Sequence, residues 1–305
     1  MKSKHTALAR VKRQTATRGK AGQEESLSRR AWRRFKRHKL GMLGLAVLTI
    51  QIVLVVLAPV ATSYGPSKVD LHNRFSPPSW LHWMGTDGVG RDVCSRVLYG
   101  GRVSLSVGVV SVLISTLIGV VLGGIAGYSG GKADSAIMRF TDVVMSFPSL
   151  IIIMILVSLL GPGASNTMIA IGLLGWPAMA RLVRGQFLSL RQRDFVVAAR
   201  CVGVSPAGIL FRHLLSNTLG PLVVAITLRV AGAILMEAGL SFLGLGVQPP
   251  TPSWGNMLRQ AQTTTYLEQL PWVWVFPGVM IVLTVLSVNF LGDGLRDALD
   301  PQMRI

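Results

Sequence analysis

The chain has 305 residues, of which 50% are hydrophobic and 14% are charged. This composition excludes intrinsic disorder over most of the chain and argues against a soluble domain, which carries about 25% charged residues. It indicates a protein with several membrane spans. The formal net charge of +18 is concentrated at the start, because residues 1–39 contain 14 Lys and Arg residues and only two acidic residues, Glu24 and Glu25.

Residues 1–39 are predicted to form a basic tail. A basic tail can bind nucleic acid, but beside an apolar span it more often faces the cytoplasm and anionic lipid. Neither interleaved aromatic and basic residues nor zinc-ligand spacing occurs in the sequence, so lipid rather than nucleic acid is the expected partner. The apolar stretch after Lys39 is too long for the core of a cleavable signal peptide.

Long apolar segments predict six membrane-spanning helices, because one span needs about 20 apolar residues. The predicted spans are residues 40–60, 103–131, 149–160 with the turn before them, 166–180, 219–240 and 271–291. The third and fourth spans form a hairpin, because Gly161, Pro162 and Gly163 supply turn chemistry between them.

An even number of spans places both termini on the same side of the membrane. With the N terminus inside, 24 Lys and Arg residues fall in predicted inner segments and six in outer segments. Because basic residues favour the cytoplasmic side, both termini are predicted to be cytoplasmic. The expected fold is an all-α membrane domain over residues 40–305, with an outer segment over 61–102 and a cytoplasmic loop over 181–213. Cys94 and Cys201 then lie on opposite sides and cannot pair.

The cytoplasmic loop has the sequence of two short helices. Residues 193–202 have helical composition, and Gly203 follows as a helix stop. Ser205 and Pro206 then occupy the N-cap and the first position of a second helix, which runs to His213.

The first of these helices has a surface that suits docking. Ala198 and Ala199 form a small flat patch, and Phe195 adds an apolar knob beside it. A short helix of this kind can insert into the groove of another protein. The alternative is a cap that packs on the protein's own spans.

Residues 192–217 resemble the cytoplasmic coupling loop of permease subunits from binding-protein-dependent ABC importers. The family pattern is Glu-Ala-Ala followed by a Gly four residues after the second Ala, and this chain has Val197, Ala198, Ala199 and Gly203. Further motifs resemble the second permease of the branch that serves dipeptides, oligopeptides and nickel. They are residues 31–35, 82–87, 90–92, 233–237, 241–255 and 291–301, in the same order.

Three positions depart from the pattern of these permeases. Val197 stands where the family usually has Glu, and Ser216 stands where it usually has Pro. Arg229 stands where the branch usually has a small or apolar residue. The first departure either weakens a polar contact to an ATPase partner or is harmless, because shape carries much of such a dock.

The resemblance implies a six-helix permease of the type I importer fold in the cell (inner) membrane of a bacterium or archaeon. Its implied partners are a second similar permease, two cytoplasmic ABC ATPases and an extracytoplasmic solute-binding protein. ATP and Mg are then bound by partner subunits, and the chain itself is not an enzyme. In agreement, residues 130–133 (Gly-Gly-Lys-Ala) fail to complete a phosphate-binding loop. The implied ATPase-coupling residues are Asp194, Phe195, Val197, Ala198, Ala199, Arg200, Gly203, Ser205, Pro206 and His213.

Several functions stay open at this point. Di- or oligopeptides are the first expected solute, and nickel, metal chelates, glutathione or oligosaccharides are alternatives. A stand-alone channel or secondary transporter would function without ATPases. A membrane anchor that binds nucleic acid would depend on residues 1–39.

Two charged residues interrupt the fifth span. An Arg at mid-span costs about 2.5–3.5 kcal/mol on insertion scales, so Arg229 is expected to face the bundle interior, water or a partner chain. Glu237 lies about 12 Å farther along the helix and about 80° around it, which argues against a direct bridge. Both are candidates for a translocation path or gate, with a structural polar contact as the alternative. No catalytic or metal site is expected, and Asp87 and Asp92 are predicted to make turns and Arg pairs.

Overall fold

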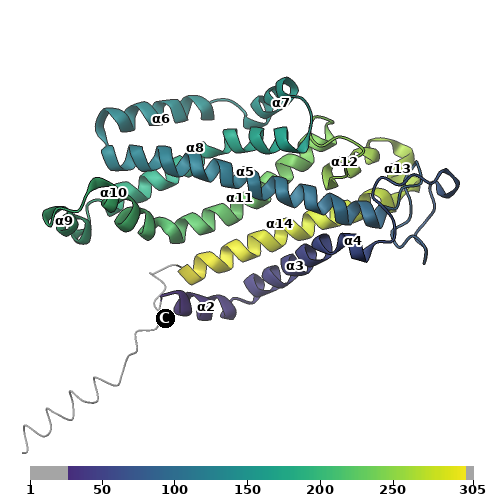
Figure 1. The fold of residues 1–305 in the computed structure, drawn as a ribbon, viewed down its shortest axis with the longest axis horizontal. Helices are drawn as coiled ribbons and strands as arrows, with labels where there is room; N and C mark the ends of the chain where they lie inside the picture. The colour runs from purple at the N-terminus through teal and green to yellow at the C-terminus, as the bar shows by residue number, and fades with distance from the viewer. Residues whose placement is uncertain (1–26, 300–305) are drawn as a thin grey trace, which may run out of the picture.

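The computed structural model describes residues 27–299, which form a long bundle of helices (Figure 1). The longer helices are α2 (Leu27–Arg37), α3 (Lys39–Val56), α5 (Val93–Ser129), α6 (Gly131–Met145), α7 (Ser149–Leu160), α8 (Ala164–Leu190), α9 (Asp194–Cys201), α11 (Ser216–Phe242) and α14 (Pro271–Leu299). The shorter ones are α4 (Ala58–Ala61), η1 (Leu71–Asn73), α10 (Pro206–Gly208), η2 (Ile209–Leu215), α12 (Trp254–Leu258), η3 (Arg259–Gln262) and α13 (Thr264–Gln269). Residues 1–26 of the predicted tail and 300–301 of the last motif lie outside this range.

Within the described range, five helices are long and apolar enough to cross a membrane. They are α3, α5, α8, the continuous helix Pro206–Phe242, and α14. The pair α6 and α7 is bent by 84° and completes a sixth crossing if it counts as one span. The predicted all-α membrane fold is confirmed, with α6 and α7 together as the third crossing.

The boundaries of several predicted segments need correction. The third span was predicted around residues 149–160, but α7 has 12 residues, and about 18 Å of helix cannot cross a hydrocarbon core of about 30 Å. Residues 132–142, predicted as an inner loop, instead lie within helix α6. α5 begins at Val93, inside the predicted outer segment, and α8 continues to Leu190, inside the predicted cytoplasmic loop.

The most extensive helix–helix contact in the described bundle joins α5 and α8. Small residues allow the two helices to approach closely. Gly119, Gly123 and Gly127 follow one another at four-residue spacing on α5. A side chain at Gly123 would collide with the backbone of Ala180, and one at Gly127 would lie 3.1 Å from the Cα of Arg184. The two helices therefore touch backbone to backbone, as small residues allow in membrane bundles.

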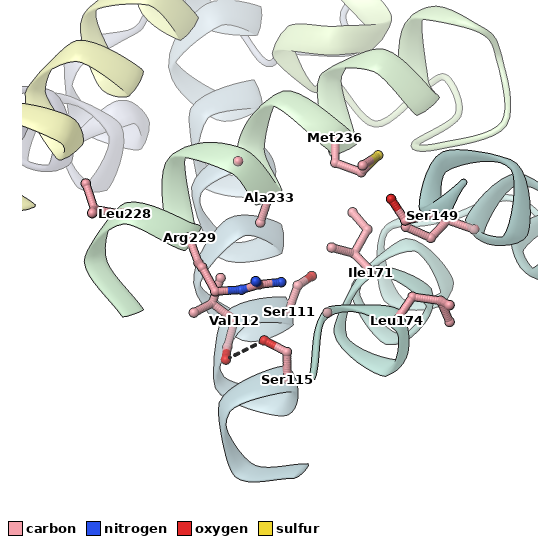
Figure 2. Close-up of a pocket in the computed structure, with 13 residues that line it drawn as sticks. Ser111, Val112, Ser115, Ser149, Ile171, Leu174, Leu228, Arg229, Ala233 and Met236 are labelled. Carbon is pink, nitrogen blue, oxygen red and sulfur yellow. Dashed lines mark hydrogen bonds between the residues drawn. The ribbon is translucent and has the colours of Figure 1, made fainter. Parts of the chain in front are cut away.

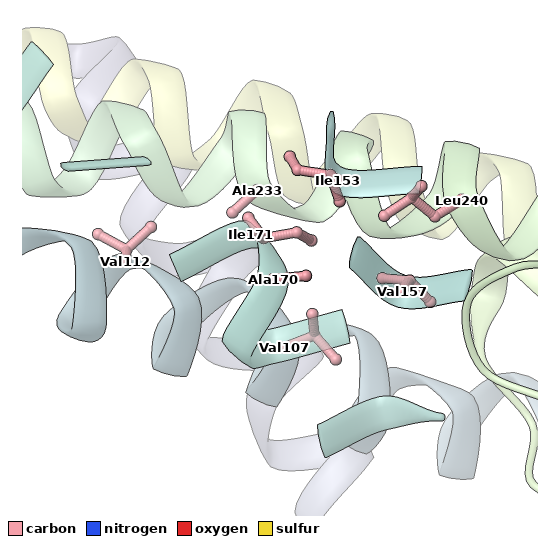
Figure 3. Close-up of a cluster of buried hydrophobic side chains, with 8 residues drawn as sticks. All are labelled: Val107, Val112, Ile153, Val157, Ala170, Ile171, Ala233 and Leu240. Atoms are coloured by element: carbon pink, nitrogen blue, oxygen red, sulfur yellow. The ribbon is translucent and has the colours of Figure 1, made fainter. Parts of the chain in front are cut away.

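The bent pair is anchored by an apolar core shared among four helices (Figure 3). Ile153 and Val157 of α7 are almost fully buried there. They pack with Val107 and Val112 of α5, Ala170 and Ile171 of α8, and Ala233 and Leu240 of α11. The bend therefore turns α7 back onto the bundle and buries one of its faces.

Both ends of the described chain lie at the end of the bundle that carries α9, here named the α9 end (Figure 1). Phe35 of α2 lies against Gly41 and Gly294, so α2 packs on the last turns of α14. α12, α13 and the segment between α4 and α5 lie at the opposite end, here named the α12 end. This arrangement is the one expected for an even number of crossings.

Candidate functional site

α9 has the boundaries that its sequence predicts. It starts after Arg193, whose backbone is extended, and Asp194 lies in its first turn, where a negative charge is favoured. Gly203 has a φ of +79° just after the helix. The N–H of Gly203 donates to the carbonyl of Arg200, and the N–H of Val204 donates to that of Ala199, both at 3.0 Å. This pair of hydrogen bonds is a Schellman motif, and it ends α9 where the Gly predicts.

The two faces of α9 differ sharply. Val196 and Ala199 are buried, and Val196 packs in a cluster that includes Phe187, Ile209 and Leu214. The opposite face is open, with Val197 47% exposed. Phe195, Ala198, Arg200 and Val202 are also exposed. One face of the helix thus caps its own bundle, and the other is an exposed apolar surface. The two residues of the predicted patch lie on different faces: Ala198 on the outer face and Ala199 on the inner face.

The second short helix predicted after Gly203 is longer than expected. Ser205 caps it by accepting a hydrogen bond from the N–H of Gly208, and Pro206 occupies its first position. The helix does not stop at His213 but continues through the π-helical segment η2 into α11. Its sequence contains no Gly or Pro between Gly208 and Gly220 that would end it. The His213 ring lies 6.5 Å from the Phe195 ring, which joins the two elements.

Two arginines connect the α9 region to the end of α5. The Arg200 guanidinium lies over the Tyr128 ring, 5.9 Å from its centroid. Arg191, between α8 and α9, donates to the carbonyl of Gly127 at 3.2 Å. Since the Gly127 carbonyl belongs to the last turn of α5, the positive charge is favourable there. A displacement of α9 therefore acts on α5 as well as on α8 and α11.

A cavity of about 340 Å³ lies in the middle of the bundle, between α5, α7, α8 and α11 (Figure 2). Its polar side chains are Arg229 and the serines Ser111, Ser115 and Ser149. The Arg229 guanidinium extends from α11 toward Ser111 (Figure 2). The remaining lining is apolar or glycine: Val112, Ile153, Ile171, Leu174, Gly175, Leu228, Gly232, Ala233 and Met236.

Glu237 does not line this cavity. Its side chain is fully buried, and its two oxygens accept hydrogen bonds from Ser104 at 2.9 Å and Ser241 at 2.7 Å. The Ser104 oxygen in turn accepts the N–H of Trp254, at 3.1 Å. This network ties α5, α11 and α12 together, which favours the structural alternative for Glu237 over a role in the path or gate. No contact joins Glu237 to Arg229, as their spacing predicts.

Two ion pairs of α6 were missed by the sequence reasoning. Asp134 accepts two hydrogen bonds from Arg184 of α8, at 2.5 and 2.7 Å. Asp142 pairs with Arg181, also of α8. The sequence shows only that both acids and both arginines lie beside charge-free stretches. This position does not indicate that the acids pair with the arginines.

The acidic residues of the predicted outer segment make structural contacts. Asp87 accepts the backbone N–H groups of Val89 and Arg91, at 3.0 Å, and pairs with the Arg91 guanidinium at 2.7 Å. Asp92 caps α5 through the N–H of Ser95 and contacts His82. Asp87 thus makes the predicted turn and Arg pair, whereas Asp92 caps a helix and contacts a histidine in place of the predicted Arg pair. Within residues 27–299 no group of three or more His, Cys, Asp or Glu side chains is placed to hold a metal ion.

Comparison with known protein families decides the class of the chain. Residues 119–305 match the family of binding-protein-dependent transport system inner membrane components. The chain belongs to this family. Residues 26–78 also match the N-terminal transmembrane domain of oligopeptide transport permease C. The chain is therefore a multi-pass permease subunit, and the predicted family is confirmed.

The permease has relatives in several bacteria. It is 51% identical to a peptide permease protein of Brucella suis over 247 residues, which cover 81% of this chain and 82% of the relative. It is 44% identical to the dipeptide transport system permease protein DppC of Bacillus subtilis over 279 residues, 92% and 87% of the two chains. The glutathione transport system permease protein GsiD of Pectobacterium atrosepticum is 46% identical over 227 residues, 74% and 75%.

The fold also matches a solved structure. A chain of the MetNI methionine ABC transporter, in an inward-facing conformation, superimposes with a TM-score of 0.56 and 20% identity. The match covers 67% of the permease and 96% of the MetNI chain. The type I importer permease fold predicted from the resemblance is confirmed by this likeness.

Proposed function

We propose that this permease carries short peptides into the cell as one of two similar permeases in an ATP-driven importer. The exposed face of α9 is the observation that carries the assembly, because an apolar helical surface outside the membrane needs a partner. Peptide as the solute is supported by the relatives from Brucella suis and Bacillus subtilis, which are named for peptide and dipeptide transport. The relative named for glutathione transport marks a second candidate solute that is itself a peptide derivative.

The α9 end is proposed to face the cytoplasm. Without residues 132–142, which lie in α6, the predicted inner segments hold 22 of the 31 Lys and Arg residues, and this bias favours the cytoplasmic side. One of two cytoplasmic ATPases would then dock on α9, the other would dock on the second permease, and the two would bind ATP and Mg²⁺. The opposite end would receive solute from an extracytoplasmic binding protein.

The proposed coupling residues have distinct tasks on α9. Phe195, Val197 and Ala198 would contact an ATPase groove, and Asp194 and Arg200 would border that contact. Gly203, Ser205 and Pro206 would hold the turn that carries α9, and His213 would support Phe195 from behind. The contact would be largely apolar, because Val197 supplies no carboxylate.

Transport would follow from a difference in docking between two states. ATP binding closes the ATPase pair, and α9 moves with it as one body. Arg200 and Arg191 carry this motion to α5, and the buried face of α9 carries it to α8 and α11. The cavity beside Arg229 would then open alternately to the two sides. Such coupling requires that α9 bind the ATPases differently in the two states.

The assembly is tested by affinity purification of the tagged permease from its host in mild detergent. The expected result is a second six-span permease with one or two kinds of ATPase. Val197→Asp should reduce the recovered ATPase, because it places a charge in an apolar contact. The matched control is Leu81→Asp, an exposed position at the α12 end. A permease that purifies alone, or equal ATPase recovery in both variants, would contradict the docking role of α9.

A further inference from the structure

Arg229 is a cation without a partner in the centre of the permease. It lies at the midpoint of α11 and borders the central cavity. Within residues 27–299 its guanidinium makes no hydrogen bond and no ion pair. A charge at this depth is costly, so it persists where it serves water, a ligand or another chain.

The cavity itself offers the guanidinium no anion. No carboxylate lines the cavity among the described residues. Two of the hydroxyls that line it donate to backbone carbonyls: Ser115 donates to that of Val112 at 3.0 Å, and Ser111 donates to that of Met168 at 3.1 Å. Because the guanidinium makes no hydrogen bond or ion pair with the described residues, all five of its N–H donors are available, and they are arranged to bind a carboxylate through two parallel hydrogen bonds.

Space for the guanidinium comes from the neighbouring helix. A Cβ atom on Gly175 of α8 would lie 3.0 Å from Nη2 of Arg229 and 2.9 Å from Cβ of Ser115. Because Gly175 has no side chain, the cation reaches the cavity between α5 and α8. Three helices thus form the site: α11 supplies the charge, α5 supplies the hydroxyls, and α8 leaves space for the guanidinium.

We propose that Arg229 binds the C-terminal carboxylate of the transported peptide within the central cavity, an inference that rests on the proposed peptide function. Every linear peptide with a free C terminus carries this group whatever its side chains, so one arginine holds solutes of varied sequence. The apolar lining, including Ile171 and Leu174, accepts varied side chains. The volume of about 340 Å³ falls at the small end of ligand pockets, which suits di- and tripeptides.

A carboxylate of the second permease would satisfy the same guanidinium and is the competing source of the anion. In that case Arg229 is a structural ion pair between subunits. Its loss would then weaken assembly and slow all solutes equally. Binding of the solute instead predicts a loss that depends on whether the solute has a free carboxylate.

The test uses the complete importer with its binding protein in proteoliposomes. Uptake is measured for dialanine and for its C-terminal amide, in unaltered protein, Arg229→Lys, Arg229→Gln and Gly175→Ala. Arg139→Gln is the matched control, because it removes an exposed charge of α6 outside the cavity. Each variant is compared with unaltered protein for the same solute, so the preference of the binding protein cancels. Binding of both radiolabelled solutes to the importer in nanodiscs, without binding protein, gives a second readout.

The expected result is a selective loss. Arg229→Gln should lower uptake and binding of dialanine about tenfold or more and change those of the amide less than about twofold. Uptake and binding of dialanine by Arg229→Lys should lie between those of unaltered protein and Arg229→Gln, since Lys keeps the charge but cannot make two parallel hydrogen bonds to a carboxylate. Gly175→Ala should act in the same direction, and Arg139→Gln should change neither solute. Equal losses for both solutes, or no loss for either, would overturn the carboxylate site. Failure of unaltered importer to take up any peptide would overturn the proposed function and this inference with it.

Discussion

The turn after α9 offers the sharpest test of the coupling role. Gly203 has a φ of +79°, and nothing lies within 4 Å of the position of a Cβ atom. A side chain there strains the backbone without a steric clash. Holding a β-branched residue in this left-handed region costs about 1–3 kcal/mol. Gly203→Val therefore disturbs the end of α9 and little else.

The strain falls on a helix with little stability of its own. α9 has eight residues, and isolated helices shorter than about 12 residues are marginal in water. Its orientation depends on the two hydrogen bonds of the Schellman motif and on the buried side chains of Val196 and Ala199. A strain of about 1–3 kcal/mol corresponds to a shift of about fivefold to 150-fold between docked and undocked orientations.

The assay measures solute uptake and ATP hydrolysis in parallel, in proteoliposomes that hold the complete importer. In Gly203→Val, uptake per ATP hydrolysed should fall at least about fivefold while the ATPases still co-purify. Gly203→Asn is the control, because Asn tolerates the left-handed region, and it should stay near the unaltered value. Unchanged uptake per ATP in Gly203→Val would refute the coupling role of this turn.

Three further predictions test the packing. Glu237→Ala should cost about 2–4 kcal/mol of stability, because it removes the acceptor of two buried hydroxyls. Glu237→Gln should cost far less, and thermal unfolding in detergent measures both variants. Equal losses would contradict the network. Asp134→Arg should cost about 1 kcal/mol, and adding Arg184→Asp should recover part of it; additive losses in this double-mutant cycle would show that the pair contributes nothing. Gly123→Leu should abolish monodisperse protein in size-exclusion chromatography by forcing α8 from α5, and Gly185→Leu, with open space around it, should not.

The membrane class and most of the spans were predictable, because they depend on long apolar runs that are visible in the sequence alone. The stop at Gly203 and the cap at Ser205 were predictable for a similar reason. Both are set by the conformational preferences of single residues and by hydrogen bonds over a few positions. Local chemistry of this kind needs no knowledge of the rest of the fold.

The third crossing was not predictable in the same way. Lys132, Asp134, Arg139 and Asp142 make residues 132–142 look like a loop. The helix tolerates two of these charges because Arg184 and Arg181 of α8 pair with them. Those partners lie about 40–50 positions away along the chain, and only the packing of α6 along α8 brings them together. A linear reading counts the charges but not their neutralisation.

The same limit explains why Arg229 and Glu237 were placed together as candidates for the path. Both are charged, and both interrupt one apolar span. The structure separates them by what surrounds them: Glu237 meets two hydroxyls in a closed network, and Arg229 meets a cavity with no acid among the described residues that line it. Glu237 is a fully buried charge whose hydrogen bonds are made, so it has little left to offer a ligand. Arg229 is a partly buried charge whose donors are free, which is costly to keep unless something arrives to bind it. The unsatisfied charge, rather than the buried one, therefore points to the solute.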